Sequence, residues 1–271
     1  MRTKPSKSPT LRIPPGPQTA RMTACGLALG TVLLAQGTPA LALAPDGVPS
    51  RQTSPALSAP GNPAHPAQSP TRPRSAVSSS DVPLYGMQLR NDCEATALRM
   101  VLAARGVRAT DQEILNRIGV DRVHYRFGDS GPLSGDPFRS FVGDPNGSEV
   151  AGTGFGVYHP PVAAAARSYG LGVSAAGQGI SLDLLRSQVT QGHPAIVWVD
   201  YLWRRAALTS YTAYDGTRVP YAGPAEHSVV VTGFSGGTVT VNDPARGRLS
   251  LPLASFAGAY ATYGNMAVIV Q

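Results

Sequence analysis

A cysteine, a histidine and an aspartate in this chain have the types and the spacing that a thiol hydrolase needs. Cys93 follows the N-cap residues Asn91 and Asp92, where an apolar stripe of helical period begins that runs to Gly106. A thiol in the first turn of a helix feels the positive end of the helix dipole, which favours the nucleophilic thiolate. The alternative for Cys93 is a buried structural cysteine.

The rest of the chain favours a reactive thiol. Cys25 lies in a leader-like segment, so Cys93 is the only cysteine left once that segment is removed. A lone cysteine in an exported protein has no internal disulfide partner, and polar residues flank this one. A thiol nucleophile also needs a base within hydrogen-bond reach and a group that orients the base.

His227 and Asp243 fit these two roles. His227 opens the strand-like segment HSVVVTGF, and Asp243 follows the next strand-like segment, TVTV. An antiparallel hairpin brings the start of its first strand beside the end of its second, so the two side chains should meet. Asn242 is the alternative orienting residue, but strand alternation points it to the opposite face. For an isolated His227 a structural role would be the simpler interpretation.

Gln88 is the candidate oxyanion-hole residue. It lies five residues before Cys93. Its side-chain amide could join the backbone N–H of Cys93 in stabilising charge on an attacked carbonyl oxygen. The alternative is an ordinary surface glutamine.

The elements that must position these residues indicate an α+β fold, because helices come first and an antiparallel sheet follows. Hydrophobic periodicity, helix caps and turn residues predict the boundaries. The predicted helices are 93–106, 110–118, 160–169, 181–191 and 253–260, and the predicted strands are 82–85, 171–175, 194–199, 228–234, 238–241, 249–251 and 266–270. Residues 120–160 read as a loop.

Composition divides the chain into three parts. Residues 1–44 combine a basic start, a short apolar run and an Ala-x-Ala site, which is typical of a secretory signal peptide; an uncleaved anchor is the alternative. Residues 45–80 are rich in Pro, Ser and Ala and predict a disordered linker. The globular domain then spans 81–271, where 15 arginines balance 15 acidic residues. The net charge of +7 therefore belongs to the leader and linker, which argues against a nucleic-acid partner.

The residues also resemble a known family. Gln88 and Cys93, EHSVVVTGF with His227, and VNDP with Asp243 are similar to the papain-like cysteine peptidases of the C39 group, and most to its stand-alone exported branch. The resemblance covers about 82–270 and implies a papain-like α+β fold with Cys93 as nucleophile, His227 as base and Asp243 as its orienting group. The family commonly places its glutamine six residues before the cysteine, whereas the gap here is five.

The expected function is an exported cysteine peptidase that acts on a peptide or protein without a cofactor. The alternatives are a peptidoglycan peptide amidohydrolase and a non-catalytic binding module on the same fold. We expect no metal site, since the chain lacks a Cys/His set. Trp203 and Tyr158 are suggested to line a substrate groove. The location is expected to be secreted or in the cell envelope, with a membrane anchor if the leader stays uncleaved and otherwise no stable span; the oligomeric state is left open.

Overall fold

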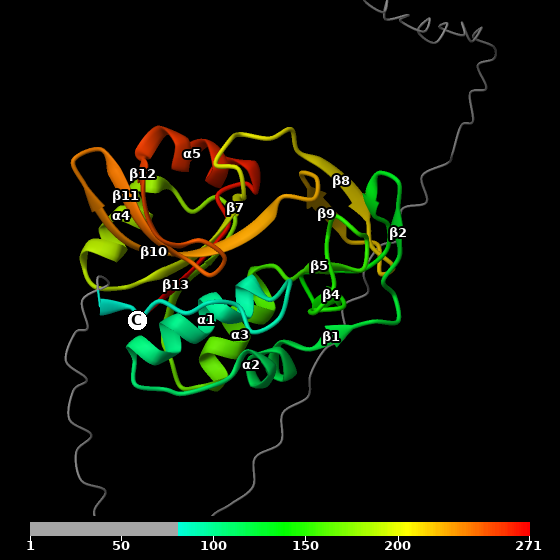
Figure 1. Ribbon diagram of the computed structural model, residues 1–271, viewed down its shortest axis with the longest axis horizontal. Helices are drawn as coiled ribbons and strands as arrows, with labels where there is room; N and C mark the ends of the chain where they lie inside the picture. The colour runs from blue at the N-terminus through cyan, green and yellow to red at the C-terminus, as the bar shows by residue number, and fades with distance from the viewer. Residues whose placement is uncertain (1–80) are drawn as a thin grey trace, which may run out of the picture. The chain divides into compact units, whose positions relative to one another are not determined.

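The computed structural model describes residues 81–271 (Figure 1). The signal peptide predicted for 1–44 and the linker predicted for 45–80 lie outside the described residues. Within the described part, no helix is both long and apolar enough to cross a membrane.

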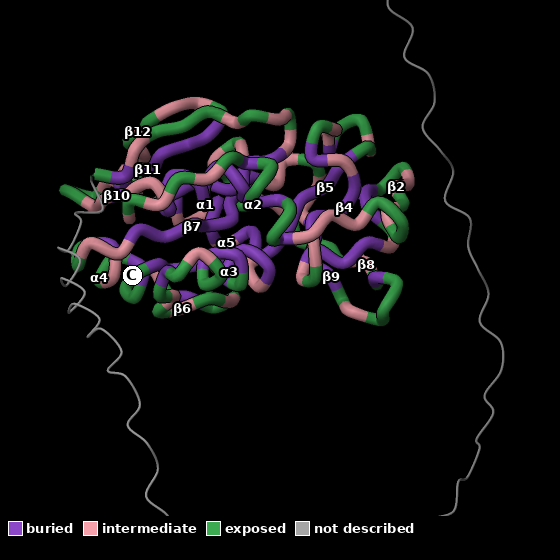
Figure 2. The backbone as a smooth tube through the Cα atoms, turned by 90° about the horizontal axis from the view of Figure 1, so that it is seen from below, coloured by how far each residue is buried: buried purple, intermediate pink, exposed green. Residues whose placement is uncertain are grey.

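A six-stranded antiparallel sheet carries the fold, and its strand order is β12-β11-β10-β7-β13-β6. Its strands are β6 (Val173–Gly177), β7 (Ala195–Asp200), β10 (Glu226–Ser235), β11 (Thr238–Asp243), β12 (Gly247–Pro252) and β13 (Ala267–Val270). β7 is central, and all its residues are buried (Figure 2), as expected for a strand with both faces covered.

Helices cover both faces of this sheet. The helices are α1 (Cys93–Ala104), α2 (Asp111–Ile118), α3 (His159–Ser168), α4 (Leu182–Thr190) and α5 (Leu253–Thr262). One hydrophobic core joins α1, α2 and α3 to Ile196 and Val230, and a second joins α4 and α5 to Val197 and Val229. Successive residues of β7 and β10 thus enter opposite cores, which follows from strand alternation. The α+β architecture expected from the sequence is confirmed.

Local signals explain the helix boundaries. Thr110 and Glu113 form a capping box at the start of α2, with each side chain bonded to the other residue's backbone. Prolines occupy the first turn of α3, where their missing N–H groups would have no helical partner. α1 begins at Cys93 with Asp92 as its N-cap, although the Asp92 side chain makes no capping hydrogen bond.

Some sequence-based expectations need correction. Residues 82–85 form no strand; Val82 is instead held because its carbonyl accepts a hydrogen bond from Asn242. The segment 120–160 is not wholly irregular, since it contains β1 (Val120–Asp121), β2 (Phe127–Gly128), β3 (Gly131–Pro132), β4 (Phe141–Gly143) and β5 (Gly154–Gly156). The hairpin of β8 (Thr209–Thr212) and β9 (Arg218–Tyr221) was not predicted, because its exposed strand β8 lacks an apolar alternation.

Candidate active site

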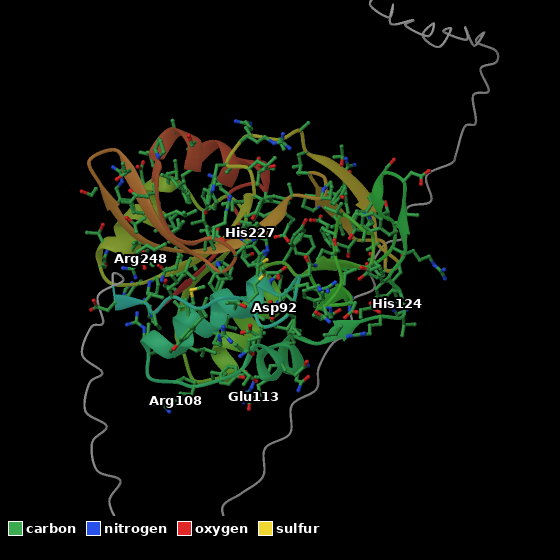
Figure 3. All side chains as sticks on the ribbon, viewed as in Figure 1. Asp92, Arg108, Glu113, His124, His227 and Arg248 are labelled. Atoms are coloured by element: carbon green, nitrogen blue, oxygen red, sulfur yellow. The ribbon has the colours of Figure 1, made fainter. Side chains whose placement is uncertain are left out.

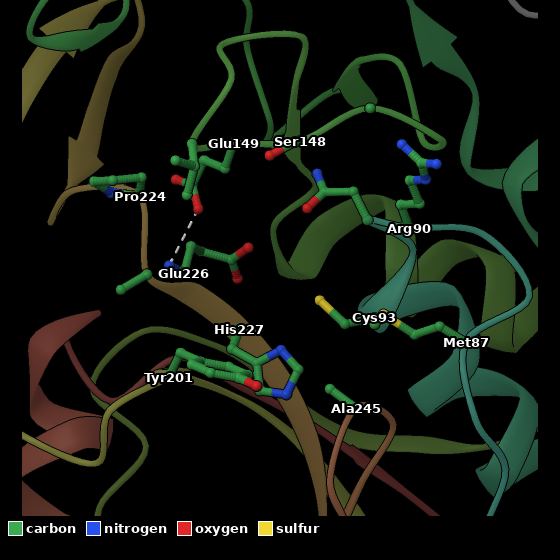
Figure 4. Close-up of a pocket in the computed structure, with 14 residues that line it drawn as sticks. Met87, Arg90, Cys93, Ser148, Glu149, Tyr201, Pro224, Glu226, His227 and Ala245 are labelled. Carbon is green, nitrogen blue, oxygen red and sulfur yellow. Dashed lines mark hydrogen bonds between the residues drawn. The ribbon is translucent and has the colours of Figure 1, made fainter.

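Cys93 and His227 line the same pocket, which has a volume of about 450 Å³. Cys93 enters it from the first residue of α1 and His227 from the start of β10 (Figure 4). Both side chains are nearly buried, with exposed fractions of 6% for Cys93 and 4% for His227. In Figure 3, His227 and Asp92 lie near the middle of the folded part, where the sheet meets α1. The fold thus brings two residues that are far apart in sequence to one site.

The β10–β11 hairpin joins His227 to Asp243. Nε2 of His227 lies 2.9 Å from Oδ1 of Asp243, and both side chains are buried. This contact confirms that the hairpin brings these two side chains together. Asn242 points elsewhere, as strand alternation predicts, and donates to the carbonyl of Val82.

Asp243 is held by more than His227. Its carboxylate also accepts hydrogen bonds from the backbone N–H groups of Ala245 and Arg246 and from the Arg246 guanidinium, at 2.7 Å from Nε. Burial raises the pKa of Asp243, but the bonds from His227, Ala245 and Arg246 outweigh it and lower the pKa to about 2. Asp243 is therefore a carboxylate at any physiological pH.

A charged Asp243 fixes the tautomer of His227. A carboxylate only accepts hydrogen bonds, so the hydrogen bond assigns a proton to Nε2 of a neutral imidazole. Nδ1 is then the unprotonated nitrogen and the one free to accept a proton. Tyr201 packs edge-on against the ring, with the centroids 5.1 Å apart, and the Arg246 guanidinium stacks over Tyr201 at 4.0 Å from its ring centroid.

Cys93 lies among carboxyl groups, which the sequence analysis did not expect. Its thiol donates to Oε2 of Glu94 at 3.5 Å, and its sulfur and carboxylate oxygens of Glu94 and Glu226 all lie within 4.8 Å of one another. Burial, then the charges of Glu94 and Glu226, raise the pKa of the Cys93 thiol well above its ordinary value. The helix dipole does not outweigh burial and these charges, so the site favours the protonated thiol over the thiolate that the sequence predicts.

Gln88 does not belong to this pocket. Its Oε1 accepts a hydrogen bond from the backbone N–H of Asp111 at the start of α2, and its own backbone N–H donates to the Asp111 carboxylate. The side chain lines a separate depression with Arg99 and Val107. The oxyanion-hole role expected for Gln88 is therefore corrected: in this structure the residue joins two segments of the fold.

Removing the Asp111 carboxylate is expected to destabilise the fold by about 3 kcal/mol. Asp111 is buried, lies 3.2 Å from Nε of Arg99 and accepts a hydrogen bond of 2.7 Å from Thr96. Asp111→Ala leaves Arg99 without its acid. Urea unfolding of the full chain measures the loss in the free energy of unfolding. The control is Thr96→Val, which removes one hydroxyl and should cost about 1 kcal/mol. Equal stability of wild type and Asp111→Ala would contradict this account.

The two suggested groove residues lie outside the pocket. Tyr158 is fully buried in the core and donates its hydroxyl to the carbonyl of Pro220, so it cannot contact a substrate in this conformation. Trp203 is half-buried and packs near Phe256 and beneath Arg246. The groove prediction for Tyr158 is wrong. Trp203 does not line the pocket either, whereas Tyr201, two positions earlier in the chain, does.

Sequence reasoning missed four residues of the site. Arg246 follows Asp243 by three residues, a spacing that a tight turn brings together, and Glu94 and Glu226 are direct neighbours of Cys93 and His227. Glu149 comes from the loop between β4 and β5, and its carboxylate accepts the backbone N–H of Glu226 at 3.3 Å. No local pattern in the sequence signals that long-range contact.

The buried carboxyls make stability fall as pH rises. Burial raises the pKa of both Asp92 and Glu94 to about 7 from ordinary values of 3.8 and 4.5. Between about pH 4.5 and 7 the unfolded chain has lost these protons while the folded chain keeps them. The free energy of unfolding should then decrease by up to about 1.4 kcal/mol per pH unit for each group.

Urea unfolding at pH 4.5 to 7.5 tests this slope. Glu94→Gln cannot ionise at position 94, so it should remove the contribution of one carboxyl from the slope of the unfolding free energy against pH. Asp183→Asn, on the exposed surface of α4, should leave that slope unchanged. A free energy of unfolding that rises with pH over this range would contradict the assignment.

A sequence profile of the Peptidase_C39 like family matches residues 79–268, more than half of the chain. The chain belongs to the Peptidase_C39 like family. It is also 32% identical over 200 residues to the uncharacterized protein YvpB of Bacillus subtilis (strain 168), covering 70% of this chain and 75% of YvpB.

One solved structure supports this membership. A crystal structure from Bacillus anthracis, assigned to the C39-like peptidases, is 25% identical, covers 71% of this chain and 95% of that chain, and superposes with a TM-score of 0.61. A double glycine motif protease from an AMS/PCAT transporter, solved with its leader peptide, is 19% identical over 70% of this chain and 91% of its own, with a TM-score of 0.39. The resemblance to the C39-like family and the papain-like α+β fold are confirmed.

Proposed function

We propose that this C39-like chain is an exported cysteine peptidase that hydrolyses peptide bonds through Cys93, His227 and Asp243. The observation that carries the proposal is the buried hydrogen bond from His227 to Asp243 in the pocket that Cys93 enters. A base oriented by a carboxylate beside a thiol is the arrangement that nucleophilic amide hydrolysis needs. Family membership supports a peptide as the substrate.

The first step moves a proton from the Cys93 thiol to Nδ1 of His227. At rest the thiol donates to Glu94, so its hydrogen must first turn from Glu94 toward the imidazole. The sulfur then attacks the carbonyl carbon, and the imidazolium that forms is stabilised by the Asp243 carboxylate. The first backbone hydrogen bond of α1 runs from the Thr96 N–H to the Asp92 carbonyl, so the Cys93 N–H has no partner within the helix. It is therefore a donor available to the oxyanion.

The second half of the reaction reverses these roles. The imidazolium gives its proton to the leaving amine as the C–N bond breaks, which leaves a thioester on Cys93. Water, deprotonated by the neutral His227, then attacks the thioester and releases the acid and the thiol. No group outside the three side chains and a water molecule is needed for this proton balance.

Peptide profiling tests the proposal. The full chain is incubated with a mixture of peptides from digested proteins, and new termini are identified by mass spectrometry. Cleavage is expected with the wild type and not with Cys93→Ser. Hydrolysis of peptidoglycan fragments by the wild type, without any cleavage of protein peptides, would replace this proposal with an amidohydrolase. Equal product formation by wild type and Cys93→Ser would reject Cys93 as the nucleophile.

A further inference from the structure

The pocket that Cys93 and His227 line has an acidic end that the proposed mechanism does not use, and Glu226 in it lies beside the Cys93 sulfur. This end is lined by Glu149, from the loop between β4 and β5, and by Glu226, the residue before His227. Figure 4 shows the Glu149 and Glu226 side chains close together at this pocket, each on a different segment of the chain. Val150 and Pro224 complete its walls.

Glu149 is a buried carboxyl with an unused oxygen. Its exposed fraction is only 7%, and while Oε2 accepts the Glu226 N–H, its Oε1 has no hydrogen-bond partner. Oε1 of Glu226 is likewise buried without a partner. Buried polar atoms are nearly always paired, and an unpaired carboxylate oxygen is among the costliest exceptions. Two such oxygens in one pocket indicate a missing donor.

A positively charged donor suits this group of carboxyls best. Among the ion pairs of residues 81–271, none involves Glu149, Glu226 or the neighbouring Glu94. Burial and the mutual repulsion of these three carboxyls raise the pKa of Glu149 and of Glu226 well above the ordinary value. A cation placed between them would supply both the hydrogen bonds and the opposite charge.

We propose that Glu149 and Glu226 form a subsite for a lysine or arginine side chain next to the scissile bond of the peptide substrate. The ammonium or guanidinium group would donate to Oε1 of Glu149 and to Glu226, and its methylene stem would lie against Val150 and Pro224. This inference rests on the proposed peptidase function, because the subsite adjoins Cys93.

A basic side chain fits this pocket better than a metal ion. The space of about 450 Å³ is far larger than one ion needs, and apolar groups form part of its wall. Glu149 lies outside the group of Cys93, Glu94 and Glu226 whose donor atoms are close enough to share an ion.

Binding and cleavage of matched peptides test the subsite separately from the chemistry. One peptide that the wild type cleaves, or failing that one fixed scaffold sequence, is made with lysine, arginine, norleucine or glutamate at each position in turn. Affinity is measured by fluorescence anisotropy on the full-length Cys93→Ala variant, and kcat/KM is measured on the wild type. At one position, the affinity and kcat/KM of the basic peptides should exceed those of the norleucine peptide on the order of ten- to a hundred-fold.

Isosteric variants assign that preference to the two carboxyls. Glu149→Gln and Glu226→Gln should each remove most of the selectivity for lysine over norleucine, while Asp183→Asn, a charge removed from the exposed surface outside the pocket, should preserve it. Because selectivity is a ratio on one enzyme, a general loss of activity in a variant does not imitate the result.

Each outcome decides between the two claims. Cleavage without any basic preference, or with a preference that both glutamine variants keep, overturns the subsite and leaves the peptidase. Glutamate-dependent binding of basic peptides without cleavage supports the subsite and overturns the peptidase. If there is neither cleavage nor glutamate-dependent binding of basic peptides, both the peptidase and the subsite are rejected. Binding of Zn²⁺ that Glu226→Gln abolishes, with no effect of basic peptides, identifies the cluster as a metal site and also overturns the subsite.

Discussion

Replacing Cys93 by alanine is expected to abolish peptide hydrolysis, and replacing His227 by alanine is expected to lower kcat/KM by at least about 10⁴-fold. The expected loss is large because the thiol of Cys93 is buried among carboxyls that hold it protonated. His227 is the proposed acceptor of that proton, and its loss removes the base that Asp243 orients. Steady-state kinetics on a peptide found by profiling measures both effects.

The two losses should not add. Cys93 and His227 act as a unit, so the double variant Cys93→Ala/His227→Ala should be no less active than the single variants. Unfolding curves of all three proteins show whether the fold survives, and Asp183→Asn serves as the matched surface control. A His227→Ala enzyme that keeps a tenth or more of the wild-type kcat/KM would remove His227 from the mechanism.

Asp243→Ala is expected to lower kcat by about 10³- to 10⁴-fold, whereas Asp243→Asn should retain substantially more activity. Alanine leaves the imidazole free to change tautomer and rotate, and it leaves the Arg246 guanidinium without its acid. Asparagine offers an amide oxygen that can still accept the Nε2–H of His227, but it loses the ion pair with Arg246. Steady-state kinetics of the two variants gives the order.

The pH dependence sharpens this second test. Because hydrogen bonds hold the pKa of Asp243 at about 2, the carboxylate should impose no limb on the activity profile above about pH 4. The same depressed pKa means that Asp243 contributes to stability above its ordinary value of 3.8, and that this contribution is lost as pH falls toward 2. Equal activity of Asp243→Ala and wild type would show that the contact is structural only.

Periodicity and turn chemistry were enough to predict the elements that position the site. The α1 start at Cys93, the β10–β11 hairpin and the meeting of His227 with Asp243 all follow from local patterns and from the geometry of antiparallel strands. The misplaced features depend on long-range contacts. Gln88 is held at the start of α2 by its hydrogen bond with the Asp111 N–H. Tyr158 can be buried since its hydroxyl donates to the Pro220 carbonyl.

The ionisation of Cys93 shows the same limit. From the sequence, the helix N-terminus favours the thiolate, and such a dipole contributes up to about 1–2 kcal/mol. The sequence does not reveal that the thiol is buried. Nor does it reveal that Glu226, which follows Cys93 by 133 residues, lies beside it. Burial is the larger effect, and it sets the opposite direction for the pKa. In the proposed mechanism the reactivity of Cys93 therefore comes from His227 and not from α1.

The most direct test of that claim is the rate of Cys93 alkylation by iodoacetamide as a function of pH, in the wild type and in His227→Ala. The sample is the full-length chain. Alkylation is quantified by mass spectrometry of the peptide that contains Cys93. If His227 takes the thiol proton, the wild type should react at least about tenfold faster near pH 7, with a profile shifted to lower pH than that of His227→Ala. Coincident profiles for the two proteins would show that His227 does not activate Cys93 and would contradict the peptidase mechanism.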